Sequence, residues 1–202
     1  NLLNYLWPLL IVLLSPVLLS GYHLSARHIL GALAGFAGAA LVVTGGQLSI
    51  NLTALPGYGS AVLAALLWAS YSLLTKRVRP FPTAAIGGFC LLSGVLSLLC
   101  HTLMEPPVSP STSQWLTLLL LGAGPMGLAF FLWDKALKLG DPRQIGALSY
   151  LTPLLSTLLL VASGRGQLGP ATGAAIALIV GGALAGTLDW RVLRRKQKHP
   201  GY

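Results

Sequence analysis

The sequence predicts an all-α integral membrane protein with seven transmembrane helices in the 202 residues of this chain. Hydrophobic residues make up 54% of the chain and charged residues only 8%, and the mean hydropathy is +0.76. These values lie outside the range of water-soluble domains. Seven apolar stretches follow one another, and most suit the roughly 20 helical residues that cross a bilayer.

The first apolar stretch, 2–20, is predicted to span the membrane. It has no basic segment before it, and Trp7-Pro8 interrupts its apolar run, so a signal peptide fits less well. The other six predicted helices are 29–45, 58–75, 83–104, 114–133, 145–163 and 170–190. The stretch 29–45 is short for a span and 58–75 is borderline, so we expect local thinning of the bilayer or helix ends that extend into the flanking residues.

The basic residues predict the orientation of the chain. With the connections assigned alternately to two sides, 12 of the 13 Lys and Arg residues fall on one side, and only Arg165 falls on the other. Because positive residues are retained in the cytoplasm, the basic tail 191–202 is predicted inside and the N-terminus outside. We therefore attribute the net charge of +9 to the topology of the chain in the membrane. Contact of the basic tail with anionic lipid is also expected, and a nucleic-acid partner is not.

Catalytic and metal-binding chemistry is not indicated. The acidic residues lie at predicted helix ends or in loops, and they are Glu105, Asp134, Asp141 and Asp189. No carboxylate is therefore expected at mid-depth, where a proton relay or a sodium site would need one. The four histidines are scattered over loops and helix ends. We predict no enzyme activity, no metal site and no cofactor.

A motif occurs twice in the chain. Asn4-Tyr5-Leu6-Trp7-Pro8-Leu9-Leu10 returns 145 positions later as Ser149-Tyr150-Leu151-Thr152-Pro153-Leu154-Leu155. The two copies are five helices apart, an odd number, so their helices should run in opposite directions. The helices that follow also match, because Gly31-Ala-Leu-Ala-Gly35 corresponds to Gly173-Ala174-Ala175 at an offset of 142. An inverted repeat of this kind is typical of secondary transporters.

The repeat predicts how the chain is divided. Residues 1–46 would be the last two helices of a first repeat, and 57–190 the five helices of the second, within a ten-helix, five-plus-five architecture. Three helices of the first repeat are then expected upstream. Residues 1–202 alone are expected not to transport, because an incomplete repeat cannot close a path.

The inverted repeat, the Tyr-Leu-x-Pro-Leu-Leu motif in both halves and the basic tail resemble the drug/metabolite transporter superfamily. The segment Asn4–Pro8 resembles its bacterial aromatic-amino-acid exporters. The resemblance covers the whole chain as helices four to ten of the family's ten, and helices one to three, which contribute cavity residues in the family, are absent.

This resemblance implies a function and a location. It implies export of aromatic and other amino acids by alternating access, by a multi-pass protein of the bacterial inner membrane. The lack of a mid-depth carboxylate favours movement down a gradient. Export of drugs or other metabolites is the alternative. A seven-helix receptor is disfavoured by the internal repeat, and a membrane enzyme by the lack of catalytic groups. The oligomeric state is not predicted.

Polar and aromatic residues at helical spacing mark the predicted substrate path, because polar side chains in membrane helices face the bundle interior or a cavity. The candidates are Asn4, Tyr5, Trp7 and Pro8 in one repeat, and Trp68, Tyr71, Met126, Phe130, Ser149, Tyr150, Thr152 and Pro153 in the other. The aromatic side chains would stack a flat ring. Carbonyls freed by the two prolines would bond the substrate ammonium group, and Asn4 with the serines its carboxylate.

Two glycine motifs have a different predicted role. Gly31-x3-Gly35 and Gly182-x3-Gly186 permit close approach of helices. Because they lie on helices at equivalent repeat positions, we expect them to pack against each other as a scaffold and not to contact the ligand.

Overall fold

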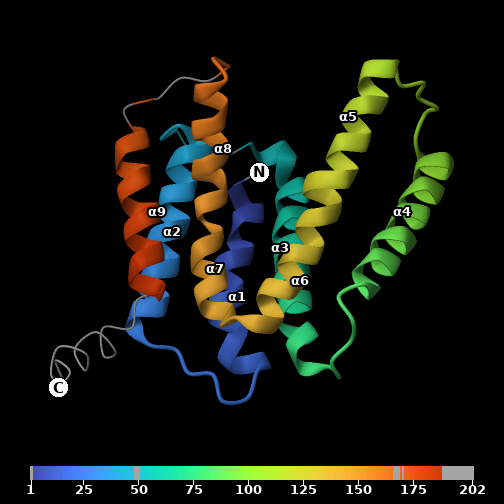
Figure 1. The fold of residues 1–202 in the computed structure, drawn as a ribbon. Helices are drawn as coiled ribbons and strands as arrows, with labels where there is room; N and C mark the ends of the chain where they lie inside the picture. The colour runs from blue at the N-terminus through green and yellow to red at the C-terminus, as the bar shows by residue number, and fades with distance from the viewer. Residues whose placement is uncertain (1, 48–50, 166–168, 170, 188–202) are drawn as a thin grey trace, which may run out of the picture. The chain divides into compact units, whose positions relative to one another are not determined.

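The computed structural model describes residues 2–47, 51–165, 169 and 171–187, and every regular element in these residues is helical (Figure 1). The elements in chain order are η1 (Leu2–Tyr5), α1 (Leu6–Leu18), α2 (Ala26–Thr44), η2 (Leu52–Ala54), α3 (Leu55–Arg77), α4 (Ala85–Met104), α5 (Thr112–Ala123), η3 (Gly124–Leu128), α6 (Ala129–Leu139), α7 (Pro142–Ser149), α8 (Leu151–Ala162) and α9 (Ala171–Thr187). Five helical stretches are long and apolar enough to cross a membrane, and Leu2–Leu18 and Ala171–Thr187 are shorter apolar helices. The predicted all-α membrane fold is confirmed. The tail 191–202 lies outside the described residues.

The second and third predicted spans are longer than the sequence indicated. Helix α2 begins at Ala26, where the ring Nδ1 of His28 accepts a hydrogen bond of 3.3 Å from the N–H of Ser25. Helix α3 has 23 residues and includes Pro56 in its first turn, a position where a missing N–H costs little. The expectation that helix ends extend into the flanking residues is therefore confirmed for both.

The chain divides into two compact units, and residues 78–140 form one of them. The predicted span 114–133 continues to Leu139 and contains a π-helical segment, Gly124–Leu128, that includes Pro125. A Cβ at Gly127 would lie 2.3 Å from the carbonyl oxygen of Gly122, so this segment requires glycine there. At the end of α6, Asp134 Oδ2 accepts hydrogen bonds from Thr83 Oγ1 at 2.7 Å and from Lys138 Nζ at 2.6 Å.

The other unit, residues 1–77 and 141–202, contains α1 to α3 and α7 to α9. Helices α2 and α9 lie side by side in it (Figure 1). A Cβ at Gly31 would lie 2.6 Å from the carbonyl oxygen of Gly182, and one at Gly38 would lie 2.6 Å from Cγ1 of Ile179. Higher numbers on α2 thus meet lower numbers on α9, so the helices are antiparallel. The prediction that the two glycine motifs pack together is confirmed.

The two copies of the repeated motif also meet within this unit. A Cβ at Gly146 of α7 would lie 2.9 Å from the carbonyl oxygen of Pro8 and 3.1 Å from Val12 Cγ2. The Tyr150 hydroxyl, four residues further on, contacts the backbone of Tyr5 and Leu9. The α7–α8 segment therefore runs opposite to α1 and touches it directly, as the inverted repeat predicts. The exact boundaries of the two repeats stay a prediction.

Candidate functional site

Each copy of the motif breaks its helix at the tyrosine. Tyr5 has φ −71° and ψ 4°, and Tyr150 has φ −69° and ψ −10°. Helices α1 and α8 begin at the next residue, so Pro8 and Pro153 are both the third residue of a new helix. A proline in the first turn gives no N–H to the carbonyl four residues earlier. The equivalent backbone geometry supports the predicted pairing of the motifs.

Three of the predicted site residues form an aromatic wall, defined here as Trp7 of α1 with Trp68 and Tyr71 of α3. The ring centroids of Trp7 and Trp68 are 6.4 Å apart with an interplanar angle of 89°. Those of Trp68 and Tyr71 are 5.5 Å apart at 34°. Edge-to-face and offset pairs at these separations are favourable. All three side chains are half-buried.

Tyr150 is placed differently from the expectation that it lines a cavity. Its side chain is 0% exposed, and it belongs to the core cluster with Leu9, Val12 and Leu154. Its hydroxyl accepts a hydrogen bond from the N–H of Leu9 and donates one to the carbonyl of Tyr5, both at 3.1 Å. Tyr150 is therefore a core residue beside the wall and not part of an open surface.

The remaining candidates of the second repeat do not share one face. Pro153 is buried, Thr152 is exposed, and the hydroxyl of half-buried Ser149 donates to the carbonyl of Ile145 at 2.7 Å. In one unbroken helix, the three- and four-residue spacing of Ser149, Thr152 and Pro153 would place them on one face. The break at Tyr150 divides that face, because ψ there departs from the helical value and rotates the following helix.

Asn4 and Tyr5 are half-buried in η1, immediately before the turn that carries Trp7. Met126 and Phe130 belong to the unit 78–140, where Met126 is 56% exposed. Their part in the substrate path therefore stays a prediction.

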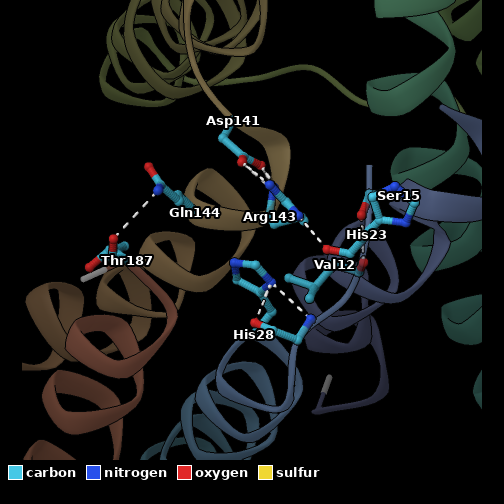
Figure 2. Close-up of polar contacts among 9 residues, drawn as sticks. Val12, Ser15, His23, His28, Asp141, Arg143, Gln144 and Thr187 are labelled. Atoms are coloured by element: carbon cyan, nitrogen blue, oxygen red, sulfur yellow. Dashed lines mark hydrogen bonds and ion pairs between the residues drawn. The ribbon is translucent and has the colours of Figure 1, made fainter. Parts of the chain in front are cut away.

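A polar cluster that the sequence analysis missed lies at the start of α7 (Figure 2). Asp141 caps the helix by accepting from the N–H of Arg143 at 2.9 Å, and its carboxylate accepts from Arg143 Nε at 3.0 Å and Nη2 at 2.5 Å. Arg143 Nη1 donates to the carbonyl of His23, and the guanidinium carbon lies 5.2 Å from the ring centroid of Tyr22. Arg143 thus joins α7 to the α1–α2 connection.

The same cluster reaches α9 and stays charged at neutral pH. Gln144 Nε2 donates to the carbonyl of Thr187 at 3.4 Å (Figure 2). Burial of the Asp141 carboxyl acts to raise its pKa, but the hydrogen bonds and charge of Arg143 outweigh burial and hold the pKa below its usual value. The signal in the sequence was Asp141-Pro142, a cap residue followed by proline at the first helical position.

The chain is similar to a known transporter family and to several known proteins. The EamA-like transporter family matches residues 55–187. The aromatic amino acid exporter YddG of Ancylobacter novellus is 46% identical over 190 residues, which is 93% of this chain and 66% of that protein. The aromatic amino acid exporter YddG of Escherichia coli K12 is 27% identical, over 96% of this chain and 67% of that protein.

A solved crystal structure that is 46% identical to the chain has the same fold, with a TM-score of 0.88. The match covers 93% of this chain and 67% of that one. The chain thus spans about two thirds of the length of the curated relatives it matches.

Proposed function

The chain belongs to the EamA-like transporter family, and from this premise we propose that it works in a secondary transporter that exports aromatic amino acids across the cell membrane. Two relatives, 46% and 27% identical to the chain, are named aromatic amino acid exporters. The observation that carries the proposal is the aromatic wall, because two tryptophans and a tyrosine from α1 and α3 meet beside a helix break.

The wall would bind the ring of the substrate. Stacking on an aromatic side chain contributes about 0.5–1.5 kcal/mol per contact beyond simple burial. The backbone break at Tyr5 would present the polar partners, since Pro8 leaves the carbonyl of Asn4 without its helical donor. That carbonyl would bond the ammonium group, and the Asn4 side chain the carboxylate. A zwitterion bound in this way needs no fixed charge beside it.

The proposed movement is alternating access down a gradient, with the two repeats rocking about the shared site. The one-sided distribution of basic residues supports an orientation with the C-terminus in the cytoplasm, and the bacterial relatives support the inner membrane. Met126 and Phe130, which belong to the unit 78–140, remain candidates on the sequence pattern alone.

Flux into liposomes by the full-length transporter tests this function. Trp7→Ala and Trp68→Ala should each lower phenylalanine flux by about 2- to 12-fold, the range that corresponds to one stacking contact, and threonine flux much less. Trp115→Ala is the matched control, because Trp115 is 55% exposed on α5. Equal losses for both substrates, or unchanged rates in both variants, would show that the wall does not select the ring.

A further inference from the structure

The Tyr150 hydroxyl is bonded to two backbone groups that bracket Trp7. It donates to the carbonyl of Tyr5, two residues before Trp7, and it accepts from the N–H of Leu9, two residues after it, each at 3.1 Å. These two groups are one helical turn apart at the start of α1. A single hydroxyl from the other repeat therefore clamps the turn from which the first ring of the aromatic wall projects.

This turn of α1 is a place where an outside clamp matters. With Tyr5 as the N-cap residue, the N–H of Leu9 and the carbonyl of Tyr5 are the groups that form the first intrahelical pair of α1, and the Tyr150 hydroxyl contacts both of them. Pro8, the third residue of α1, has no N–H at all. The Tyr150 hydroxyl therefore adds bonds from another helix to the turn that carries Trp7, and the edge-to-face geometry with Trp68 depends on the orientation of that turn.

The ring of Tyr150 is held independently of its hydroxyl. A Cβ at Gly35 would lie 2.4 Å from Cδ2 of Tyr150, so the ring occupies the space that glycine leaves on α2. The ring also meets Phe36 at a centroid distance of 6.4 Å and an angle of 63°. Tyr150→Phe should therefore keep the ring in place and remove only the two hydrogen bonds.

We propose that Tyr150 is a positioning residue for substrate selection: it does not touch the substrate, and it sets the selectivity for aromatic substrates by fixing the turn that presents Trp7 to Trp68. The proposal rests on the proposed function, because selectivity for an aromatic ring has meaning only in a carrier that binds one. Because its side chain is fully buried, Tyr150 supports the aromatic wall and does not line it.

The test compares Tyr150→Phe with the parent in the full-length transporter reconstituted in liposomes. The apparent KM for phenylalanine should rise about 5- to 30-fold, the range that corresponds to the loss of one to two hydrogen bonds, while its maximal rate and the threonine flux stay within about twofold. Tyr58→Phe is the matched control, because its hydroxyl also accepts from a backbone N–H, that of Asn51 at 3.1 Å, outside the wall. In a Trp7→Ala background, Tyr150→Phe should cause no further loss of selectivity, since residues that act through one another are not additive.

Amide hydrogen exchange separates this proposal from the proposed function. The Leu9 amide should exchange about fivefold faster in Tyr150→Phe and should be unchanged in Tyr58→Phe. Unchanged exchange at Leu9 would overturn the clamp whatever the substrate. Equal loss of phenylalanine and threonine flux, or losses that multiply with Trp7→Ala, would assign Tyr150 a general structural role instead. A parent protein that moves no aromatic amino acid, with Leu9 exchange still accelerated by Tyr150→Phe, would refute the proposed function and with it the selectivity role, but would keep the clamp on the Trp7 turn.

Discussion

The contact between α2 and α9 gives the sharpest stability test, because two adjacent glycines of α9 differ completely in their surroundings. A Cβ at Gly182 would lie 2.6 Å from the carbonyl oxygen of Gly31 and 2.9 Å from the backbone nitrogen of Gly35. A Cβ at Gly181 would meet nothing within 4 Å. Gly182→Ala and Gly181→Ala therefore make the same chemical change one residue apart.

The expected cost follows from the distances. The atoms facing Gly182 are backbone, so they cannot rotate away as a flexible side chain would. To reach an ordinary contact of 3.4 Å from 2.6 Å, the two helices must separate locally by about 0.8 Å. A gap of 0.5–1 Å forfeits a quarter to a half of each dispersion contact along the seam, and overpacking of this kind costs about 1–3 kcal/mol. Both variants should also gain up to about 1 kcal/mol from helix propensity, so this contribution cancels when the two are compared.

The two variants should therefore differ by about 1–3 kcal/mol in the free energy of unfolding, with Gly182→Ala the less stable. Reversible unfolding by SDS in mixed micelles, followed by circular dichroism, measures this difference. Equal stability of the two variants would show that α2 and α9 are not in backbone contact in the protein. The same result would remove the scaffold role of the glycine motifs.

Three further predictions concern the ends and connections of the helices. In variants with a single cysteine, Ser111→Cys should react with an impermeant maleimide from outside the cell and Arg79→Cys only from the cytoplasm; the reverse pattern would overturn the orientation read from the basic residues. Arg143→Lys should lose the two-pronged contact with Asp141, lower the free energy of unfolding by about 1 kcal/mol and speed amide exchange in residues 19–25. The pKa of Asp141 is lower in the folded protein than in the unfolded chain. Its contribution to the free energy of unfolding is therefore complete above the unfolded pKa of about 3.9 and is lost as the pH falls through the folded pKa. Thermal unfolding of the parent protein should accordingly show no step due to Asp141 between about pH 5 and 8.

The helices were predictable because the signal for a membrane span is local. About 20 apolar residues must satisfy their backbone groups within one segment, and this requirement needs no knowledge of neighbours. The ends were less predictable, because they depend on single contacts. His28 reaches back to Ser25 at the start of α2, and Pro56 is accommodated in the first turn of α3.

The faces of the helices were predicted less well, because helical spacing assumes a constant rotation per residue. The break at Tyr150 and the π-helical segment Gly124–Leu128 both interrupt that rotation. The spacing of Trp68 and Tyr71 lies within the unbroken helix α3, and there the prediction of a shared aromatic face agrees with the observed ring contact. The Asp141–Arg143 cluster was not predicted, because the only sequence pattern that includes Arg143 is the one-sided distribution of basic residues.

The repeated motif does not predict how deeply its two tyrosines are buried, and the cause lies outside the motif. Tyr5 and Tyr150 occupy equivalent positions and have nearly the same backbone angles, yet Tyr150 is fully buried and Tyr5 is half-buried. Gly35 leaves the space that the Tyr150 ring fills, with only 2.4 Å from a would-be Cβ to Cδ2. At the repeat offset of 142, the counterpart of Gly35 is Ala177, which has a Cβ. The second repeat therefore has no glycine at the position equivalent to Gly35, and the space that the Tyr150 ring fills is not repeated there. A motif repeat thus predicts the shared backbone break, while the burial of each tyrosine depends on residues outside the motif, such as Gly35 beside the Tyr150 ring.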